Sequence, residues 1–316
     1  MTMKTGADAE HRGCPANRQS ARQWTIEGDI ERGVDCAAVP LDGDHGTNAR
    51  ALNLLVMFRG MSTPPRWPKS HLVSDQRFFF LHVMKTAGGT LRQQILANFE
   101  REQVYPWKRV DADMLTANTS LDYLTSLPAS RRARIRAFTG HFPFMAVELL
   151  GGGLNTITIL RDPVERTLSY LSQRKRNDDV RRGLSLEEIY EDASLFHSLI
   201  RDHQAKLFAL TANDRPSSFG HVLDVDAARL EIAKRNLERV DVLGTQDRFD
   251  DLLSELERRF GWRCGPIVNQ NVGPRTPEDV PVSFRRRIAE DNPADMEFFE
   301  HAVRLCEQRR NAATAR

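Results

Sequence analysis

Apolar positions form a sustained pattern in this chain only from about residue 77 onward. The clearest element is the run FFFLHV, which begins at Phe78 and is followed by Lys85, Thr86 and two glycines. A continuous run of Phe, Leu and Val bounded by turn residues predicts a strand that is buried on both faces. Thr90 and Leu91 then open a predicted helix.

A second strand over residues 156–160 runs directly into another helix. Asp162 is a good N-cap, Pro163 suits the first helical position, and Glu165 completes a pattern similar to a capping box. Arg161 therefore lies at the carboxyl end of a strand, which is where open α/β sheets bind ligands.

The remaining pattern alternates between further helices and one more short strand. We expect helices over about 129–137, 185–210, 226–240 and 249–260 and after residue 293, with a strand at 242–243. Few strands, each followed by a helix, predict a parallel sheet covered on both faces. The expected fold class is α/β, a P-loop-like three-layer sandwich with a central parallel sheet flanked by helices.

The first 74 residues differ in composition from the rest of the chain. They are rich in Asp, Gly, Arg, Asn and Ala, and only residues 51–58 are apolar. That segment is too short to cross a bilayer and too far inside the chain to be a signal sequence. We therefore expect residues 1–74 to be a disordered or loosely attached extension, and residues 75–310 to form one domain.

Charge and cysteine content narrow the choice of partners only a little. The net charge of +2 says little about binding, and the arginine-rich runs are not interleaved with stacking aromatics, so a nucleic-acid partner is not expected. The four cysteines, at 14, 36, 264 and 306, form no C-x-x-C pair. We expect neither a zinc site nor a disulfide framework.

The loop after the first strand has the chemistry of a phosphate site. Gly88 and Gly89 let backbone amides approach an anion, the following helix presents free N–H groups and a favourable dipole, and Lys85 adds a cation. The loop is not a Walker A motif, because its lysine precedes the glycines. The alternative is an ordinary strand–turn–helix joint whose glycines serve packing.

The second strand–helix unit offers a second anion site. The fork of Arg161 and the hydroxyl of Ser169, about two helical turns later, could together hold a separate phosphate. The alternative interpretation makes Arg161 and Glu165 a local ion pair and Ser169 a helix-filling residue.

His141 is the candidate base. It follows Gly140 inside the apolar stretch AFTGHFPF, and neutral imidazole can accept a hydroxyl proton near pH 7. The alternative is a buried histidine that bonds a backbone carbonyl. Glu148 and His82 are rival bases.

These segments resemble the motifs of one enzyme family. The order K-T-A-G-G-T is similar to the 5′-phosphosulfate loop of sulfotransferases, whose donor is 3′-phosphoadenosine 5′-phosphosulfate (PAPS), and the strand–RDPVER–S pattern is similar to their 3′-phosphate element. The segment GHFPF resembles the GHxxF segment of the Golgi polysaccharide sulfotransferases related to the heparan sulfate 2-O enzymes. Looser resemblances at 202–210, 240–253 and 269–275 extend the similarity over residues 77–307, although Ala205 and Lys206 depart from the usual Thr and Arg.

The resemblance implies a PAPS-dependent O-sulfotransferase that acts on a hydroxyl of a carbohydrate, either a glycan or a glycolipid, and requires no metal. It implies that His141 and Lys85 are catalytic. The donor-binding residues would be Lys85, Thr86, Ala87, Gly88, Gly89, Thr90, Leu91, Arg161 and Ser169.

Two other functions remain open at this point. One is a kinase-like phosphotransferase that uses ATP, and the other is a non-catalytic module that binds a nucleotide or a glycan. Because the sequence offers no membrane anchor of the kind that tethers Golgi enzymes, we expect a soluble, cytoplasmic, bacterial member of the family. Peripheral association with a membrane is left open.

Overall fold

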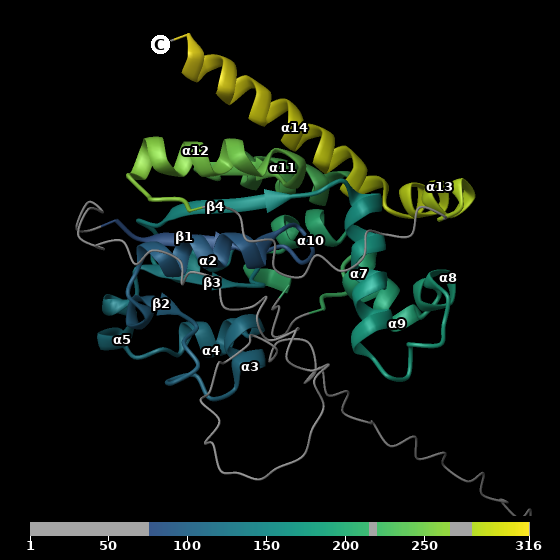
Figure 1. Cartoon of the computed structure of the whole chain (residues 1–316), viewed down its shortest axis with the longest axis horizontal. Helices are drawn as coiled ribbons and strands as arrows, with labels where there is room; N and C mark the ends of the chain where they lie inside the picture. The colour runs from purple at the N-terminus through teal and green to yellow at the C-terminus, as the bar shows by residue number, and fades with distance from the viewer. Residues whose placement is uncertain (1–75, 215–219, 266–279, 316) are drawn as a thin grey trace, which may run out of the picture.

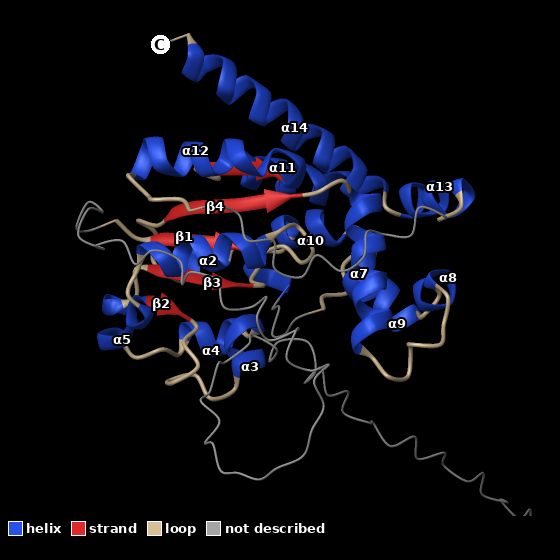
Figure 2. Ribbon diagram, viewed as in Figure 1, coloured by secondary structure: helices blue, strands red, loops and turns tan. Residues whose placement is uncertain are grey.

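Five short strands form one all-parallel sheet in the order β2-β3-β1-β4-β5 in the computed structural model, which describes residues 76–214, 220–265 and 280–315 (Figure 1). The strands are β1 (Phe78–Leu81), β2 (Val104–Tyr105), β3 (Ala137–Gly140), β4 (Asn155–Leu160) and β5 (Val242–Thr245). Helices cover both faces of this sheet (Figure 2). The predicted α/β three-layer sandwich is confirmed.

The central strand β1 is buried on both faces, as its unbroken apolar run predicts. Phe78 and Phe80 belong to the core on one face, and Phe79 and Leu81 to the core on the other, because successive side chains of a strand alternate. Leu81 pairs in register with Gly140 of β3 and with Thr158 of β4. The carboxyl ends of these three strands therefore lie at one edge of the sheet.

The helices divide between the two faces and one end of the sheet. On the face of Phe78 lie α2 (Gly88–Asn98) and α12 (Phe249–Phe260). The opposite face carries α3 (Met114–Thr119), α4 (Leu121–Thr125), α6 (Ala146–Leu149), α10 (His203–Ala209), α11 (Ala227–Glu238) and α14 (Pro293–Thr314). A third core, at the carboxyl edge, joins α7 (Pro163–Asn177), α8 (Leu186–Tyr190), the π-helical turn Phe196–Ile200 and α13 (Val282–Asp291).

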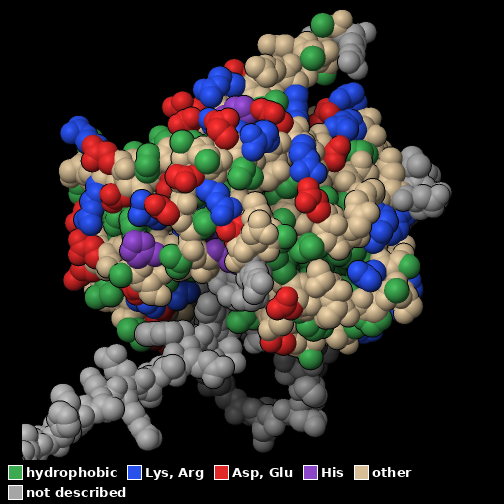
Figure 3. Space-filling model, turned by 180° about the vertical axis from the view of Figure 1, so that it is seen from behind, with side chains coloured by type: hydrophobic (Ala, Val, Ile, Leu, Met, Phe, Trp, Pro, Cys, Tyr) green, Lys and Arg blue, Asp and Glu red, His purple; other side chains and the backbone are tan. Residues whose placement is uncertain are grey.

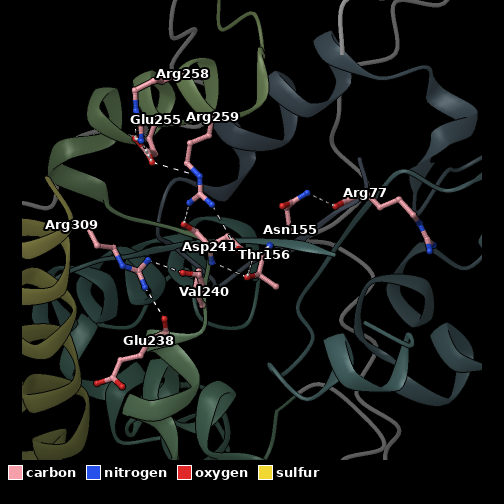
Figure 4. Close-up of polar contacts among 10 residues, drawn as sticks. All are labelled: Arg77, Asn155, Thr156, Glu238, Val240, Asp241, Glu255, Arg258, Arg259 and Arg309. Atoms are coloured by element: carbon pink, nitrogen blue, oxygen red, sulfur yellow. Dashed lines mark hydrogen bonds and ion pairs between the residues drawn. The ribbon is translucent and has the colours of Figure 1, made fainter. Parts of the chain in front are cut away.

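Polar contacts at the opposite, amino edge of the sheet serve the fold (Figure 4). The Asp241 carboxylate accepts hydrogen bonds of 2.8 Å from the amide and from the hydroxyl of Thr156, which ties the start of β5 to β4. Arg309 of α14 donates to the carbonyls of Val240 and Glu238 at 2.7 and 2.8 Å. The polar side chains of this network bond one another and the backbone carbonyls at the end of α11.

Several element boundaries differ from the prediction. The helix predicted over 185–210 is interrupted: Asp192 caps a new short helix, α9 (Ala193–Leu195), and Asp202 adopts a left-handed conformation with φ 47° before α10 begins. The basic helix α5 (Ala129–Arg134) stops earlier than predicted, because residues 137–140 form β3. The first helix begins at Gly88, two residues before Thr90.

Other predicted boundaries are confirmed. Asp162 caps α7 by accepting from the amide of Glu165, Ser185 and Glu188 form a capping box, and α12 ends at Gly261 with φ 68°. The predicted extension 1–74 and the segment 269–275 lie outside the described residues. Over the described ranges, we find no helix whose length and apolar character would let it span a bilayer.

Candidate functional site

Three loops meet at the carboxyl edge of the sheet, one after each of the adjacent strands β3, β1 and β4. The chain leaves β1 along α2 on one face, whereas the connection from β4 to β5 includes α10 and α11 on the other face. The two connections diverge at the boundary between β1 and β4, which is the position where open α/β sheets bind ligands. Figure 2 shows the strand arrows pointing toward α7 and α10.

The loop from β1 to α2 holds two non-glycine residues in the left-handed region, Lys85 with φ 68° and Ala87 with φ 71°. Such a conformation costs on the order of 1 kcal/mol per residue and is concentrated at ligand-binding loops. The hydroxyl of the fully buried Thr86 donates to the Val83 carbonyl at 2.9 Å, which closes the turn. The Thr86 side chain therefore supports the loop.

At the start of α2, some backbone N–H groups bond a carbonyl of the same turn and others do not. Thr90 and Leu91 donate their N–H groups to the Ala87 carbonyl, at 3.0 and 3.3 Å. A helix gives its first N–H groups no internal acceptor, so those of Gly88 and Gly89 face out of the helix end. Leu91, the last residue of the predicted donor-binding range, has its side chain in the core.

The two glycines of this loop have different neighbours. A Cβ built on Gly88 would lie 1.9 Å from the His82 ring, whereas one on Gly89 would meet nothing within 4 Å. Gly88 is therefore required by close approach of the histidine, and Gly89 leaves open space at the helix end.

This contrast predicts the outcome of a matched pair of substitutions. Gly88→Ala should lower the free energy of unfolding by about 1–3 kcal/mol, because the His82 ring or the loop must move. Gly89→Ala should change the free energy of unfolding by less than about 1 kcal/mol. Urea denaturation of both variants measures the difference, and equal destabilisation would contradict the packing described above.

Arg161 points toward the Lys85 turn. Its Nη1 donates to the Lys85 carbonyl at 3.3 Å, and its Nε is buried with no hydrogen-bond partner among the described residues. Burial lowers the pKa of Arg161, while nearby Glu165 and Asp162 raise it. The two predicted anion-binding elements are thus brought together in the structure.

Glu165 is engaged mainly by another helix. It lies 3.9 Å from Arg161 Nη2, but forms a much closer ion pair with Arg285 of α13. Arg285 thereby offsets a negative charge that would repel an anion at Arg161. Ser169, one turn beyond Glu165 on α7, is half-buried, and its hydroxyl makes no hydrogen bond to a described residue.

His141 packs against His82 beside this loop, with the two rings tilted by 34°. The ring centroids are 4.4 Å apart, and His141 Nδ1 lies 2.7 Å from the His82 carbonyl. A carbonyl only accepts, so Nδ1 carries the proton and Nε2 is the basic nitrogen of the neutral ring. The alternative of a histidine bonded to a backbone carbonyl is therefore correct for Nδ1, and it is compatible with a base at Nε2.

The electrostatic surroundings keep both histidines neutral. Burial lowers the pKa of His141 to about 4, with the His82 carbonyl opposing and Arg92 reinforcing the shift. Burial, followed by the charges of His141, Arg92 and Lys85, lowers the pKa of His82 well below its usual value. At neutral pH both rings are therefore uncharged.

Glu148, the predicted rival base, lies on the surface in α6. It pairs with Arg239 at 2.9 Å, and both side chains are more than half exposed. His82 is the rival that shares the site with His141.

Three buried or partly buried side chains of the site were missed by sequence reasoning. Arg166 is fully buried and donates to the carbonyls of Met84, Leu199 and Ile200, so it ties the β1 loop to the segment before α10. Arg92 donates to Thr139 and to the Pro106 carbonyl beside the two histidines. Gln204 of α10 bonds the backbone of Arg161.

Four arginines of the basic runs at 131–136 and 174–182 are paired with local acids. Arg131 bonds Asp111, Arg174 and Arg181 bond Asp178, and Arg182 bonds Asp179. Figure 3 shows basic and acidic side chains interspersed over one face of the molecule. The charges of these four arginines are therefore offset by neighbouring carboxylates.

No protein-family model and no curated protein matches this chain.

Cys264 and Cys306 are free thiols whose pKa values burial raises to about 12 and about 11. Within the described ranges, no three His, Cys, Asp or Glu side chains are grouped so that they could hold a metal ion.

Together these residues place two candidate anion-binding positions and a neutral imidazole pair at the carboxyl ends of the strands. The first candidate position is the loop of residues 85–89, and the second is Arg161, whose guanidinium donates to the Lys85 carbonyl. Such an arrangement can hold a ligand with two separate anionic groups and accept a proton beside it.

Proposed function

We propose that this protein is an O-sulfotransferase that moves a sulfuryl group from PAPS to a hydroxyl of a carbohydrate, on a glycan or a glycolipid. The observation that carries the proposal is the contact between the Arg161 guanidinium and the Lys85 turn. It brings the Arg161 guanidinium to the loop that carries Lys85, and PAPS has two separate anionic groups, a 3′-phosphate and a 5′-phosphosulfate.

The proposed reaction is an in-line displacement at sulfur. The acceptor oxygen forms a bond to sulfur as the bond from sulfur to the bridging phosphate oxygen breaks. Nε2 of His141 takes the hydroxyl proton, and 3′,5′-adenosine bisphosphate leaves with the electron pair of the broken bond. Lys85 and the amides of residues 86–89 stabilise the charge that grows on the leaving phosphate.

The two binding elements have separate tasks in this scheme. Arg161 and Ser169 hold the 3′-phosphate, which positions the donor and selects it over nucleotides without that group. Thr90, at the start of α2, adds a hydroxyl close to the 5′ side. The proposal does not require a metal, because lysine and amides fulfil the role that magnesium has toward ATP.

A thermal-shift comparison tests donor class directly. A ligand at about 100 times its dissociation constant stabilises the fold by about 2.7 kcal/mol, which is roughly 5–10 °C for a domain of this size. We expect that 3′,5′-adenosine bisphosphate produces this shift at concentrations where adenosine 5′-phosphate and ATP with magnesium do not. A larger shift with ATP and magnesium would favour a kinase.

Transfer of radiolabelled sulfate from PAPS to a panel of glycans and glycolipids then separates an enzyme from a binding module. Labelled product identifies the acceptor class. Tight binding of the bisphosphate with no transfer to any acceptor would favour the non-catalytic alternative.

A further inference from the structure

Gln204 holds both polar groups of the backbone at Arg161. Its side-chain oxygen accepts from the Arg161 N–H at 3.1 Å, and its side-chain nitrogen donates to the Arg161 carbonyl at 2.8 Å. The Gln204 side chain is fully buried. Two hydrogen bonds in opposite directions fix the orientation of the backbone from which the Arg161 side chain extends.

Arg161 needs such an external partner because of its place in the chain. It lies between the end of β4 at Leu160 and the N-cap of α7 at Asp162. Its N–H and carbonyl therefore fall at a junction between two elements. Its guanidinium has only a 3.3 Å hydrogen bond to the Lys85 carbonyl and a 3.9 Å approach to Glu165. These contacts are too weak to define its direction alone.

Gln204 is itself held in place by α14. The Asp295 carboxylate accepts from the backbone amides of Gln204 and Ala205 at 3.2 and 2.7 Å, and so caps α10 from a different helix. Asp202 in turn accepts from the Asp295 amide at 2.9 Å. All three contacts are buried, so the position of Gln204 is defined by a rigid element on the opposite face of the sheet from α2.

We propose that Gln204 is a positioning residue that orients the Arg161 guanidinium toward the 3′-phosphate. Asp295 keeps Gln204 in place by capping α10. The proposal rests on the proposed function, since it assigns a role within the same donor site. It goes further by naming the residue that determines how strongly the protein distinguishes nucleotides with and without a 3′-phosphate.

The test measures one ratio by isothermal titration calorimetry: the affinity for 3′,5′-adenosine bisphosphate divided by that for adenosine 5′-phosphate. The two ligands differ only in the 3′-phosphate. The variants are Gln204→Ala, which removes both hydrogen bonds, and Gln204→Glu, which keeps the acceptor but loses the donor. The matched control is Asn236→Ala. Asn236 lies in α11 and bonds the carbonyl of Phe208, which is at the other end of α10 from Gln204.

We expect the ratio to fall about tenfold in Gln204→Ala, which corresponds to the loss of one well-directed charge-assisted hydrogen bond. In Gln204→Glu the ratio should fall further, because the added carboxylate pairs with Arg161 and repels the phosphate. The affinity for adenosine 5′-phosphate should stay within about twofold in both variants. Asn236→Ala should keep the wild-type ratio.

Two results would overturn the positioning role: an unchanged ratio in both Gln204 variants, or an equal loss of affinity for both nucleotides, which would indicate a purely structural effect. If one Gln204 variant does not fold, as judged by circular dichroism, the other decides. Failure of the proposed function is distinct, because the wild-type protein would then show no preference for the bisphosphate.

A double-mutant cycle adds an independent readout. If Gln204 acts through Arg161, Gln204→Ala should have no further effect on the ratio in an Arg161→Ala background. An additive effect would mean that Gln204 reaches the nucleotide by another route, and would contradict the proposal.

Discussion

Replacement of His141 by alanine is expected to reduce the turnover of sulfuryl transfer by about two to four orders of magnitude while the affinity for 3′,5′-adenosine bisphosphate is retained. The reason is that Nδ1 is occupied by the His82 carbonyl at 2.7 Å, so the basic Nε2 is the atom that can take the hydroxyl proton. Steady-state kinetics with labelled PAPS and an acceptor from the glycan panel measures the loss.

His141→Asn is the sharper form of this experiment. The asparagine amide can still donate to the His82 carbonyl, but it has no basic nitrogen, so the fold is kept and the chemistry is lost. His301→Asn is the control, since His301 lies in α14 and contacts Glu238 at 3.1 Å. Loss of bisphosphate binding in His141→Asn would instead make His141 structural, and full activity would transfer the role of base to His82.

The pH dependence of kcat/KM offers a second check on His141. A pKa of about 4 keeps the imidazole neutral, and therefore basic, throughout the range from pH 8 to about pH 5. We expect no loss of activity near pH 6.5 that could be assigned to this histidine. Such a loss in the wild-type enzyme that disappears in His141→Asn would contradict the burial described here.

Replacement of Arg161 by alanine is expected to weaken binding of 3′,5′-adenosine bisphosphate by about 100-fold. The guanidinium makes one hydrogen bond, of 3.3 Å, to the Lys85 carbonyl, and its buried Nε has no partner among the described residues. Its N–H donors are therefore expected to bond a doubly charged phosphate. The affinity for adenosine 5′-phosphate should change by less than about threefold. Calorimetry with the two nucleotides measures both values.

Two further variants show whether the loss is specific. Arg161→Lys keeps the charge but not the planar fork, and should recover only part of the affinity. Arg174→Ala removes an arginine of the same helix that is paired with Asp178, and should leave both affinities unchanged. Equal weakening of both nucleotides by Arg161→Ala would mean that Arg161 supports the Lys85 loop and does not bind the 3′-phosphate.

The sequence predicted the central part of this fold because β1 and β4 are short segments rich in aromatic, aliphatic and β-branched residues, with clear turn and cap residues after them. It missed β2 and β3, since Val104–Tyr105 is only two residues long and the strand Ala137–Gly140 is not bounded by turn residues on its amino side. The break between α8 and α10 was missed because it depends on tertiary contacts. Asp202 takes a left-handed conformation where it meets the start of α14.

The candidate site was predictable where a residue lies in the loop that follows a strand. Lys85, His141 and Arg161 each leave the carboxyl end of β1, β3 or β4, and the structure places all three at one edge of the sheet. Gln204 and Arg166 were missed because their partners are backbone groups of distant segments, which no local pattern reveals. One signal was present for Gln204, since it lies in segment 202–210, which loosely resembles a segment of the sulfotransferases.

The central claim is that two anion pockets, one after β1 and one after β4, bind the two ends of one nucleotide. A crystal structure of the protein with 3′,5′-adenosine bisphosphate tests it most directly. We predict that the 5′-phosphate contacts Lys85 and the amides of residues 86–89, and that the 3′-phosphate contacts the Arg161 guanidinium and the Ser169 hydroxyl. A 3′-phosphate that lies in solvent, or an Arg161 side chain turned away from the nucleotide, would contradict the account.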